Sequence, residues 1–102
     1  MGVDLHWENE RGELLGGVDD PRNLVVQLVA VANPERSRCL RFIDPYGDTY
    51  FNQMQIPVFE EEIRSLSSGQ LSAEAEAHRE EIMKLIASAK GQVHTYLKFY
   101  GD

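Results

Sequence analysis

Two stretches of this chain echo each other and decide how its sheet is predicted: residues 40–48 read LRFIDPYGD, and residues 97–102 read LKFYGD. Each stretch carries apolar residues, a basic residue and a Phe, and then runs into a turn that ends in Gly-Asp. This composition is typical of a β-strand that enters a tight turn. We therefore expect both stretches to be strands of one small domain, although the echo is too brief to indicate a duplication.

The residues that precede the first stretch predict further strands. Val3, Leu5 and Trp7 alternate with polar residues, which is the period of a strand with one buried face. Residues 14–17, which read LLGG, either close a hairpin onto that strand or form an irregular loop.

A hairpin and a short third strand are predicted next. Leu24 to Ala32 is almost continuously apolar, as expected of a central strand covered on much of both faces. Asn33 to Ser37 has the composition of a turn, and Arg38 to Ile43 then returns as an antiparallel strand. After a second turn at Asp44 to Asp48, Thr49 to Phe51 completes a three-stranded meander.

The spacing of apolar residues changes after Asn52 from the two-residue period of a strand to that of a helix. Pro57 suits a first helical position, and Gly69 marks the end of the helix that follows. Ser72 is the predicted N-cap of a second helix that ends near Gly91. The apolar face of the first helix consists of Phe59, Ile63 and Leu66, and that of the second of Ala75, Ile82, Leu85, Ile86 and Ala89.

The end of the chain, His94 to Tyr100, returns to the two-residue period of a strand. Strands first, then two helices, then a closing strand is the order of an α+β domain. We predict one domain over residues 1–102, with a mostly antiparallel sheet of about four to five strands and two antiparallel helices on one face.

Charge and cysteine content exclude several functions. The net charge of -7 argues against binding to nucleic acid or to an anionic membrane, because such binders cluster Lys and Arg. Cys39 is the single cysteine, so no disulfide within the chain and no Cys-based zinc site is expected. No signal peptide or membrane-spanning stretch is evident. We expect a cytoplasmic protein without a cofactor.

One face of the predicted sheet gathers polar side chains. If the helices cover the face that bears Trp7 and Leu97, alternation places a polar set on the opposite face. Imidazoles beside a cation and a phenol suit anion binding or proton transfer, although separate solvated positions explain the same pattern. This candidate face consists of His6, Gln27, Arg41, His94, Tyr96 and Lys98.

The turn at residues 44–48 is a second candidate site. Asp44 and Asp48, with Asn52, offer oxygen ligands for a hard cation, but their spacing is wrong for an EF-hand, so no metal is expected. Asp44 and Gly47 are equally explained by the needs of a tight turn. Tyr46 of this turn and Tyr100 of the tail are candidate interaction residues.

The sequence supports a catalytic site less strongly than it supports these two candidate sites. His94 or His6 as a base with Asp44 or Asp48 as its orienting group is one hypothesis. Cys39 with His94 is another, but a lone cysteine in a strand is more often a small buried hydrophobic residue. No hydrolase, zinc-protease or phosphate-loop motif is present.

The turn Ile43 to Thr49 followed by Phe51-Asn52, together with the tail His94 to Asp102, resembles a group of small bacterial proteins. These proteins carry a D-P-x-G-D-T-x-F-N turn and a similar C-terminal strand. The group has no established activity, so the resemblance supplies no catalytic residue. It implies a bacterial, cytoplasmic origin and directs attention to the turn and the tail.

Three classes of function remain open. The first is a protein-protein interaction module, regulatory or immunity-like, with a homodimer through the uncovered face or an edge strand as a variant. The second is a binder of a small ligand or metal on the polar face or at the turn. The third is a small enzyme that uses the His6, His94 and Arg41 face.

Overall fold

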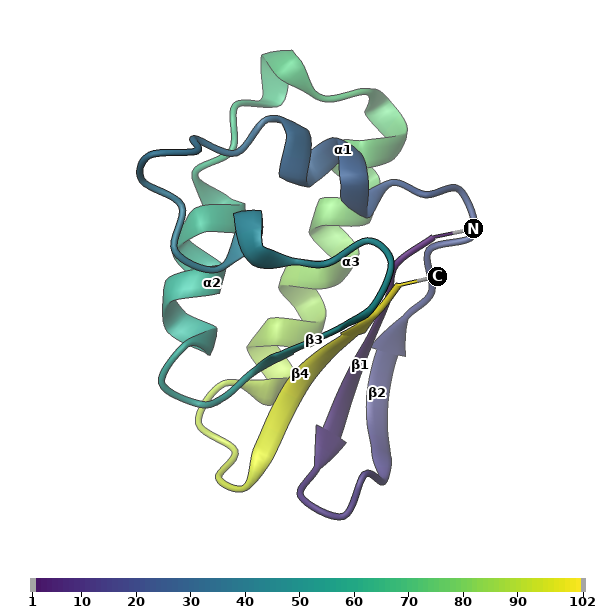
Figure 1. Cartoon of the computed structure of the whole chain (residues 1–102), viewed down its shortest axis with the longest axis vertical. Coiled ribbons are helices and arrows are strands. Elements are labelled where there is room, and N and C mark those ends of the chain that lie inside the picture. The colour runs from purple at the N-terminus through teal and green to yellow at the C-terminus, as the bar shows by residue number, and fades with distance from the viewer. Residues whose placement is uncertain (1, 102) are drawn as a thin grey trace.

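The computed structural model describes residues 2–101, which form a four-stranded antiparallel sheet with helices packed on one face (Figure 1). The predicted α+β class is confirmed. The strands are β1 (Asp4–Asn9), β2 (Leu14–Val18), β3 (Asp48–Phe51) and β4 (Thr95–Tyr100), in the order β2-β1-β4-β3. The helices are α1 (Val25–Ala30), α2 (Ile56–Arg64) and α3 (Ala73–Ala89), with short 3-10 helices at Leu40–Phe42 and Ser68–Gln70.

The centre of the sheet is the pair formed by β1 and β4, which come from opposite ends of the described chain and lie side by side in Figure 1. Leu5 faces Phe99 and His6 faces Lys98 across this pair. Because side chains alternate along a strand, Leu5 and Phe99 point to one face while His6 and Lys98 point to the other. Both Leu5 and Phe99 are completely buried.

Three phenylalanines join the sheet to the helices. Phe51 on β3, Phe59 on α2 and Phe99 on β4 lie with ring centroids 5.2 to 5.9 Å apart. Aromatic pairs at such separations stabilise a core beyond the area that they bury. Helix α3 contacts β1, β2 and β4, and α2 packs against α3, so the helices cover one face of the sheet.

The two predicted helices are present, and their caps follow the sequence. The Asn52 carboxamide oxygen accepts the amides of Met54 and Gln55 just before α2, and Pro57 lies in the first turn. The Ser72 hydroxyl accepts the Ala75 amide at 3.1 Å, which confirms its N-cap role. Helix α2 ends at Arg64, so its predicted end at Gly69 is wrong.

The predicted central strand at Leu24 to Ala32 is wrong, because this segment contains α1. The Asp20 carboxylate accepts the amides of Leu24, Val25 and Val3 at 2.6 to 3.1 Å, so it both starts the helix and ties it to β1. A short apolar run fits a buried helix as well as a strand. Gln27, predicted on the sheet face, instead lies on α1 and accepts the Ser72 hydroxyl.

The predicted strand at Arg38 to Ile43 is also wrong, and the predicted hairpin is lost with it. The Glu62 carboxylate on α2 accepts the amides of Arg38, Cys39 and Leu40 at 2.8 to 3.2 Å. The Ser37 hydroxyl donates to the same carboxylate at 2.8 Å. Amides that converge on one carboxylate cannot also form a strand ladder, so the segment folds into a 3-10 helix.

These contacts define a carboxylate clamp, formed by Glu62 and the four donors of residues 37–40. Burial alone would raise the pKa of Glu62, but the amides of Leu40, Arg38 and Cys39 and the Ser37 hydroxyl outweigh it and lower the pKa. The clamp therefore holds an ionised carboxylate at neutral pH. It fixes the course of the chain between α1 and β3.

Replacing Glu62 with Gln should destabilise the fold. The amide group turns a donor toward backbone donors, and hydrogen bonds to an ionised group are lost, which costs about 2 kcal/mol. Urea unfolding followed by circular dichroism measures this loss. Glu61→Gln is the matched control, because Glu61 lies next in sequence on α2, is exposed and pairs only with neighbouring side chains.

The same pair of variants tests the pH dependence. Because the pKa of Glu62 is lower in the folded protein than in the unfolded chain, the clamp contributes fully above the ordinary value of 4.5. Its contribution is lost as the pH falls from there toward the folded pKa. The stability difference between wild type and Glu62→Gln should therefore shrink below that value. A difference that stayed constant in acid would contradict this account.

Candidate functional site on the open sheet face

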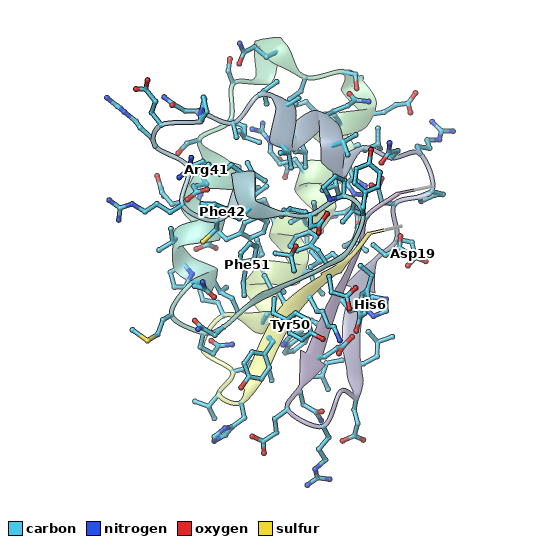
Figure 2. All side chains as sticks on the ribbon, viewed as in Figure 1. His6, Asp19, Arg41, Phe42, Tyr50 and Phe51 are labelled. Carbon is cyan, nitrogen blue, oxygen red and sulfur yellow. The ribbon has the colours of Figure 1, made fainter. Side chains whose placement is uncertain are left out.

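The face of the sheet turned away from α3 carries polar and aromatic side chains. By alternation from the observed register, β1 contributes His6 and Glu8 to this face, and β4 contributes Tyr96, Lys98 and Tyr100. Tyr50 on β3 faces Lys98 across the neighbouring pair. In Figure 2, His6 and Tyr50 mark its two sides. We call this set the open face: His6, Glu8, Tyr50, Tyr96, Lys98 and Tyr100.

Glu8 is the centre of the open face. It is only 7% exposed, although no helix within residues 2–101 covers this side of the sheet. The Tyr100 hydroxyl donates to its Oε2, and His6 Nδ1 lies 3.1 Å from the same oxygen. The rings of His6 and Tyr100 contact each other with centroids 4.7 Å apart. Neighbouring side chains, and not the core, therefore remove this carboxylate from water.

Lys98 lies between two tyrosine rings. Its Nζ is 4.3 Å from the ring centroid of Tyr50 and 4.6 Å from that of Tyr100, which are cation-π distances. Hydrogen bonding with the hydroxyls of Tyr100 and Tyr50 raises the pKa of Lys98. Lys98 thus stays positively charged at neutral pH. Burial, reinforced by the bond to Glu8, raises the pKa of Tyr100, which stays a neutral donor.

A hollow of about 450 Å³ borders the open face. Its walls combine Glu8, Tyr50, Tyr96 and Lys98 with residues 9–12 of the turn between β1 and β2. Two cations (Lys98 and Arg11), two carboxylates (Glu8 and Glu10) and two phenols line the hollow, so it suits a small polar molecule with an aromatic or apolar part.

The structure brings together half of the predicted polar set. His6, Tyr96 and Lys98 share the open face, as alternation predicted. Arg41 does not, because it lies on the 3-10 helix Leu40–Phe42, well apart from His6 in Figure 2. His94 precedes β4 with a positive φ of 59°, and its Nδ1 lies 3.3 Å from Glu10. The two histidines therefore do not form one site.

The predicted turn at residues 44–48 is held by its own backbone contacts. The Asp44 carboxylate accepts the Tyr46 amide at 2.9 Å, and the Thr49 hydroxyl accepts the Asp44 amide at 2.9 Å. A Cβ on Gly47 would lie 2.7 Å from the Asp44 carboxylate. Asp44 and Gly47 therefore both contribute to the geometry of this turn. Tyr46, which belongs to this turn, is 78% exposed.

The turn at residues 44–48 also contacts the C-terminal stretch whose sequence resembles it. The Gly101 amide donates to the Gly47 carbonyl at 2.7 Å, and Asp48 faces Tyr100 in the sheet. Asp102, which ends the second echo, lies outside the described residues. Within residues 2–101 no group of three or more His, Cys, Asp or Glu side chains is placed to hold a metal ion, and the Asn52 side chain already accepts the Met54 and Gln55 amides in the turn before α2.

Cys39 is buried in the core and is 3% exposed. Burial, followed by the negative charge of Glu62, raises the pKa of its thiol. A thiol of this kind is a poor nucleophile at neutral pH. The structural interpretation of Cys39 as a small buried residue fits these observations better than a thiolate pair with the exposed His94.

Two residues of the open face, Glu8 and Tyr50, are not among the polar set predicted from the sequence. The signal for Glu8 was present, because it follows Asp4 and His6 at two-residue spacing. Tyr50 was assigned to a strand, but its partner strand was unknown. No local sequence pattern indicates the hydrogen bond from the Tyr100 hydroxyl to Glu8, because the two residues lie 92 positions apart.

No protein-family model matches this chain, and comparisons with curated proteins and with solved structures give no match either. Within the described part of the chain, no helix has both the length and the apolar character needed to cross a membrane.

Tyr100→Phe should lower the stability of the domain by about 1 kcal/mol, because the buried Glu8 carboxylate loses a hydroxyl donor. Tyr46→Phe removes an exposed hydroxyl elsewhere and is the control, with an expected change close to zero. Thermal unfolding of both variants measures the difference. Equal melting temperatures would show that the Tyr100 hydroxyl does not support Glu8.

Gly101→Ala should separate the tail from the turn. An added Cβ would lie 2.5 Å from the Pro45 carbonyl and 2.7 Å from the Asp44 carbonyl oxygen, so backbone must move. We expect a loss of about 1 to 3 kcal/mol, as for other overpacked sites. Gly69→Ala is the control, since its nearest neighbour would be 3.9 Å away. Faster amide exchange at β3 in Gly101→Ala alone would locate the effect.

Proposed function

We propose that this domain is a protein-protein interaction module that binds its partner with the open face. One observation carries the proposal: tyrosines and a lysine are ordered around a buried glutamate on a sheet face that no helix covers. The partner is either another protein or a second copy of this chain. A regulatory or immunity-like role in a bacterial cytoplasm fits a reduced, unpaired Cys39.

The composition of the open face supports this function. Tyrosine is enriched at interfaces because it buries a large ring at low entropic cost and keeps a polar hydroxyl. Tyr50 is 54% exposed, and Leu14, which faces Glu8 from β2, is 60% exposed. An apolar and aromatic surface with one central cation is therefore available to a partner.

The contacts within the open face reduce the cost of binding. The Tyr100 ring is held by Glu8, His6 and Lys98, and Tyr50 is held by Lys98. Side chains that are already ordered lose less rotamer freedom when a partner arrives. A solvated face with no role would not need a buried carboxylate to fix its aromatic residues.

The second candidate function is binding of a small molecule in the hollow beside Lys98. The observation in its favour is the 450 Å³ space between Tyr50, Tyr96 and the turn at residues 9–12. A ligand that binds the native state raises its melting temperature. A rise with one member of a panel of small carboxylates and phenols would favour this alternative, especially if Lys98→Met abolished it.

Photo-crosslinking tests the interaction module directly. A benzoylphenylalanine residue replaces Tyr50 or Tyr96 in the full chain, which is expressed in its native host and irradiated. We expect a covalent adduct of one defined mass from each position, because both side chains lie on the binding surface. An adduct of twice the mass of the chain would identify a homodimer, and any other mass a different protein.

Benzoylphenylalanine at Tyr46 provides the control, since Tyr46 is more exposed than Tyr50 but lies at the turn and not on the open face. Adducts from Tyr50 and Tyr96 without one from Tyr46 support the proposal. Adducts from Tyr46 alone, or from none of the three positions, would contradict it. Circular dichroism checks that each labelled chain is folded.

A further inference from the structure

Three arginines lack the acidic partners that the other arginines have. Among the described residues, Arg11, Arg22, Arg64 and Arg79 each lie within 4.0 Å of a glutamate carboxylate. The remaining three form no ion pair with any residue between 2 and 101, although the chain carries a net charge of -7. They follow one another closely in sequence: Arg36, Arg38 and Arg41.

All three line one groove of about 890 Å³ between the 3-10 helix Leu40–Phe42 and the start of α2. We call it the arginine groove. Its apolar side consists of Phe42, Pro57 and Val58. Phe42 is 59% exposed, which is unusual for a phenylalanine in a folded domain. Figure 2 shows Arg41 and Phe42 together, apart from His6 and Tyr50 on the open face.

Acidic residues of the groove are largely satisfied by other groups. Glu62 accepts the backbone donors of the carboxylate clamp, and Glu61 pairs with Arg64 at 3.3 Å. Glu35 is the remaining acid of the lining. Arg36 and Arg38 keep free guanidinium donors in this groove, whereas Glu35 is the one lining carboxylate that accepts no hydrogen bond from residues 2–101.

The clamp fixes the backbone that carries Arg38 and Arg41, and the Arg41 side chain is held as well. Glu62 binds the amides of Arg38 and its neighbours, and the Ser37 hydroxyl accepts the Arg41 amide at 3.0 Å. The Arg41 guanidinium donates to the Pro34 carbonyl at 2.8 Å and lies 4.5 Å from the centroid of the Phe42 ring. A guanidinium held beside an aromatic ring is prepared to bind a carboxylate with little loss of freedom.

We propose that the arginine groove binds an acidic segment of a partner protein, with Asp or Glu side chains on the arginines and an aromatic or aliphatic side chain against Phe42, Pro57 and Val58. Charge complementarity favours this occupant over nucleic acid. Glu35, Glu61 and Glu62 line the groove together with the arginines, and these interspersed negative charges disfavour a continuous phosphate backbone more than they disfavour separate carboxylates. The arginine groove is separate from the open face, and this proposal does not depend on the function proposed for that face.

Selection from a random dodecapeptide library on the intact chain tests the proposal. We expect enriched peptides to combine two or more Asp or Glu residues with an aromatic or branched aliphatic residue. Their affinity, measured by fluorescence anisotropy, should fall as salt rises. In Arg36→Ser/Arg38→Ser it should fall about tenfold, the effect of losing charged contacts worth about 1.4 kcal/mol. Neither side chain contacts another described residue through a hydrogen bond or ion pair, so the variant should fold.

The charge-matched control is Arg22→Ser/Lys84→Ser, which also removes two positive charges but lies outside the groove. It should bind the enriched peptides as wild type does. The proposal is overturned by three results: enrichment of neutral or basic peptides, equal weakening in both double variants, or no enrichment at all. Tighter binding of a single-stranded dodecathymidylate that depends on Arg36 and Arg38 would overturn it in favour of nucleic acid.

Discussion

Antiparallel pairing of β1 with β4 is the constraint on which the rest of this domain depends. It places Leu5, Phe99 and their neighbours on the inner face, where α3 covers them, and it places His6, Glu8 and Lys98 on the outer face. A shift of one residue in this register would exchange the two sets. The core and the proposed binding surface are therefore two sides of the same pairing. The edge strands β2 and β3 add residues to both faces of the sheet, but they do not determine which residues of β1 and β4 lie on each face.

Two carboxylates organise parts of the chain outside the sheet, and a third acts on the open face. Asp20 accepts amides at the start of α1 and ties it to β1, Glu62 gathers residues 37–40, and Glu8 holds Tyr100. Each accepts more than one donor, and the bonds to the ionised Glu62 gain most, because hydrogen bonds to an ionised acceptor are about twice as strong as those between neutral groups. The acidity of this chain is thus only partly a matter of solubility. Two of the acids that line the arginine groove, Glu61 and Glu62, are likewise engaged elsewhere, so Arg36 and Arg38 pair with neither.

Much of the fold follows from the sequence where local signals agree. Alternation predicts β1 and β4, the β-branched and aromatic residues of 49–51 predict β3, and Asn52, Pro57 and Ser72 mark the starts of both long helices. The segments at 24–32 and 38–43 fail because apolar content alone does not separate a strand from a helix. Their conformation is set by Asp20 and by Glu62, the latter more than twenty residues away. The site divides in the same way: His6, Tyr96 and Lys98 come from correctly predicted strands, whereas Arg41 was assigned to a strand that does not exist.

Because β1 covers residues 4–9 and its central partner covers residues 95–100, the sheet cannot close until almost all of this domain has been synthesised. During translation, β1 and β2 have only each other, and a lone two-stranded hairpin is marginally stable in water. Helix α3, with 17 residues, is long enough to form earlier from local contacts, and its apolar face then stays exposed. Assembly of this domain is therefore a late and concerted event, in which the arrival of β4 buries the core and completes the open face in the same step.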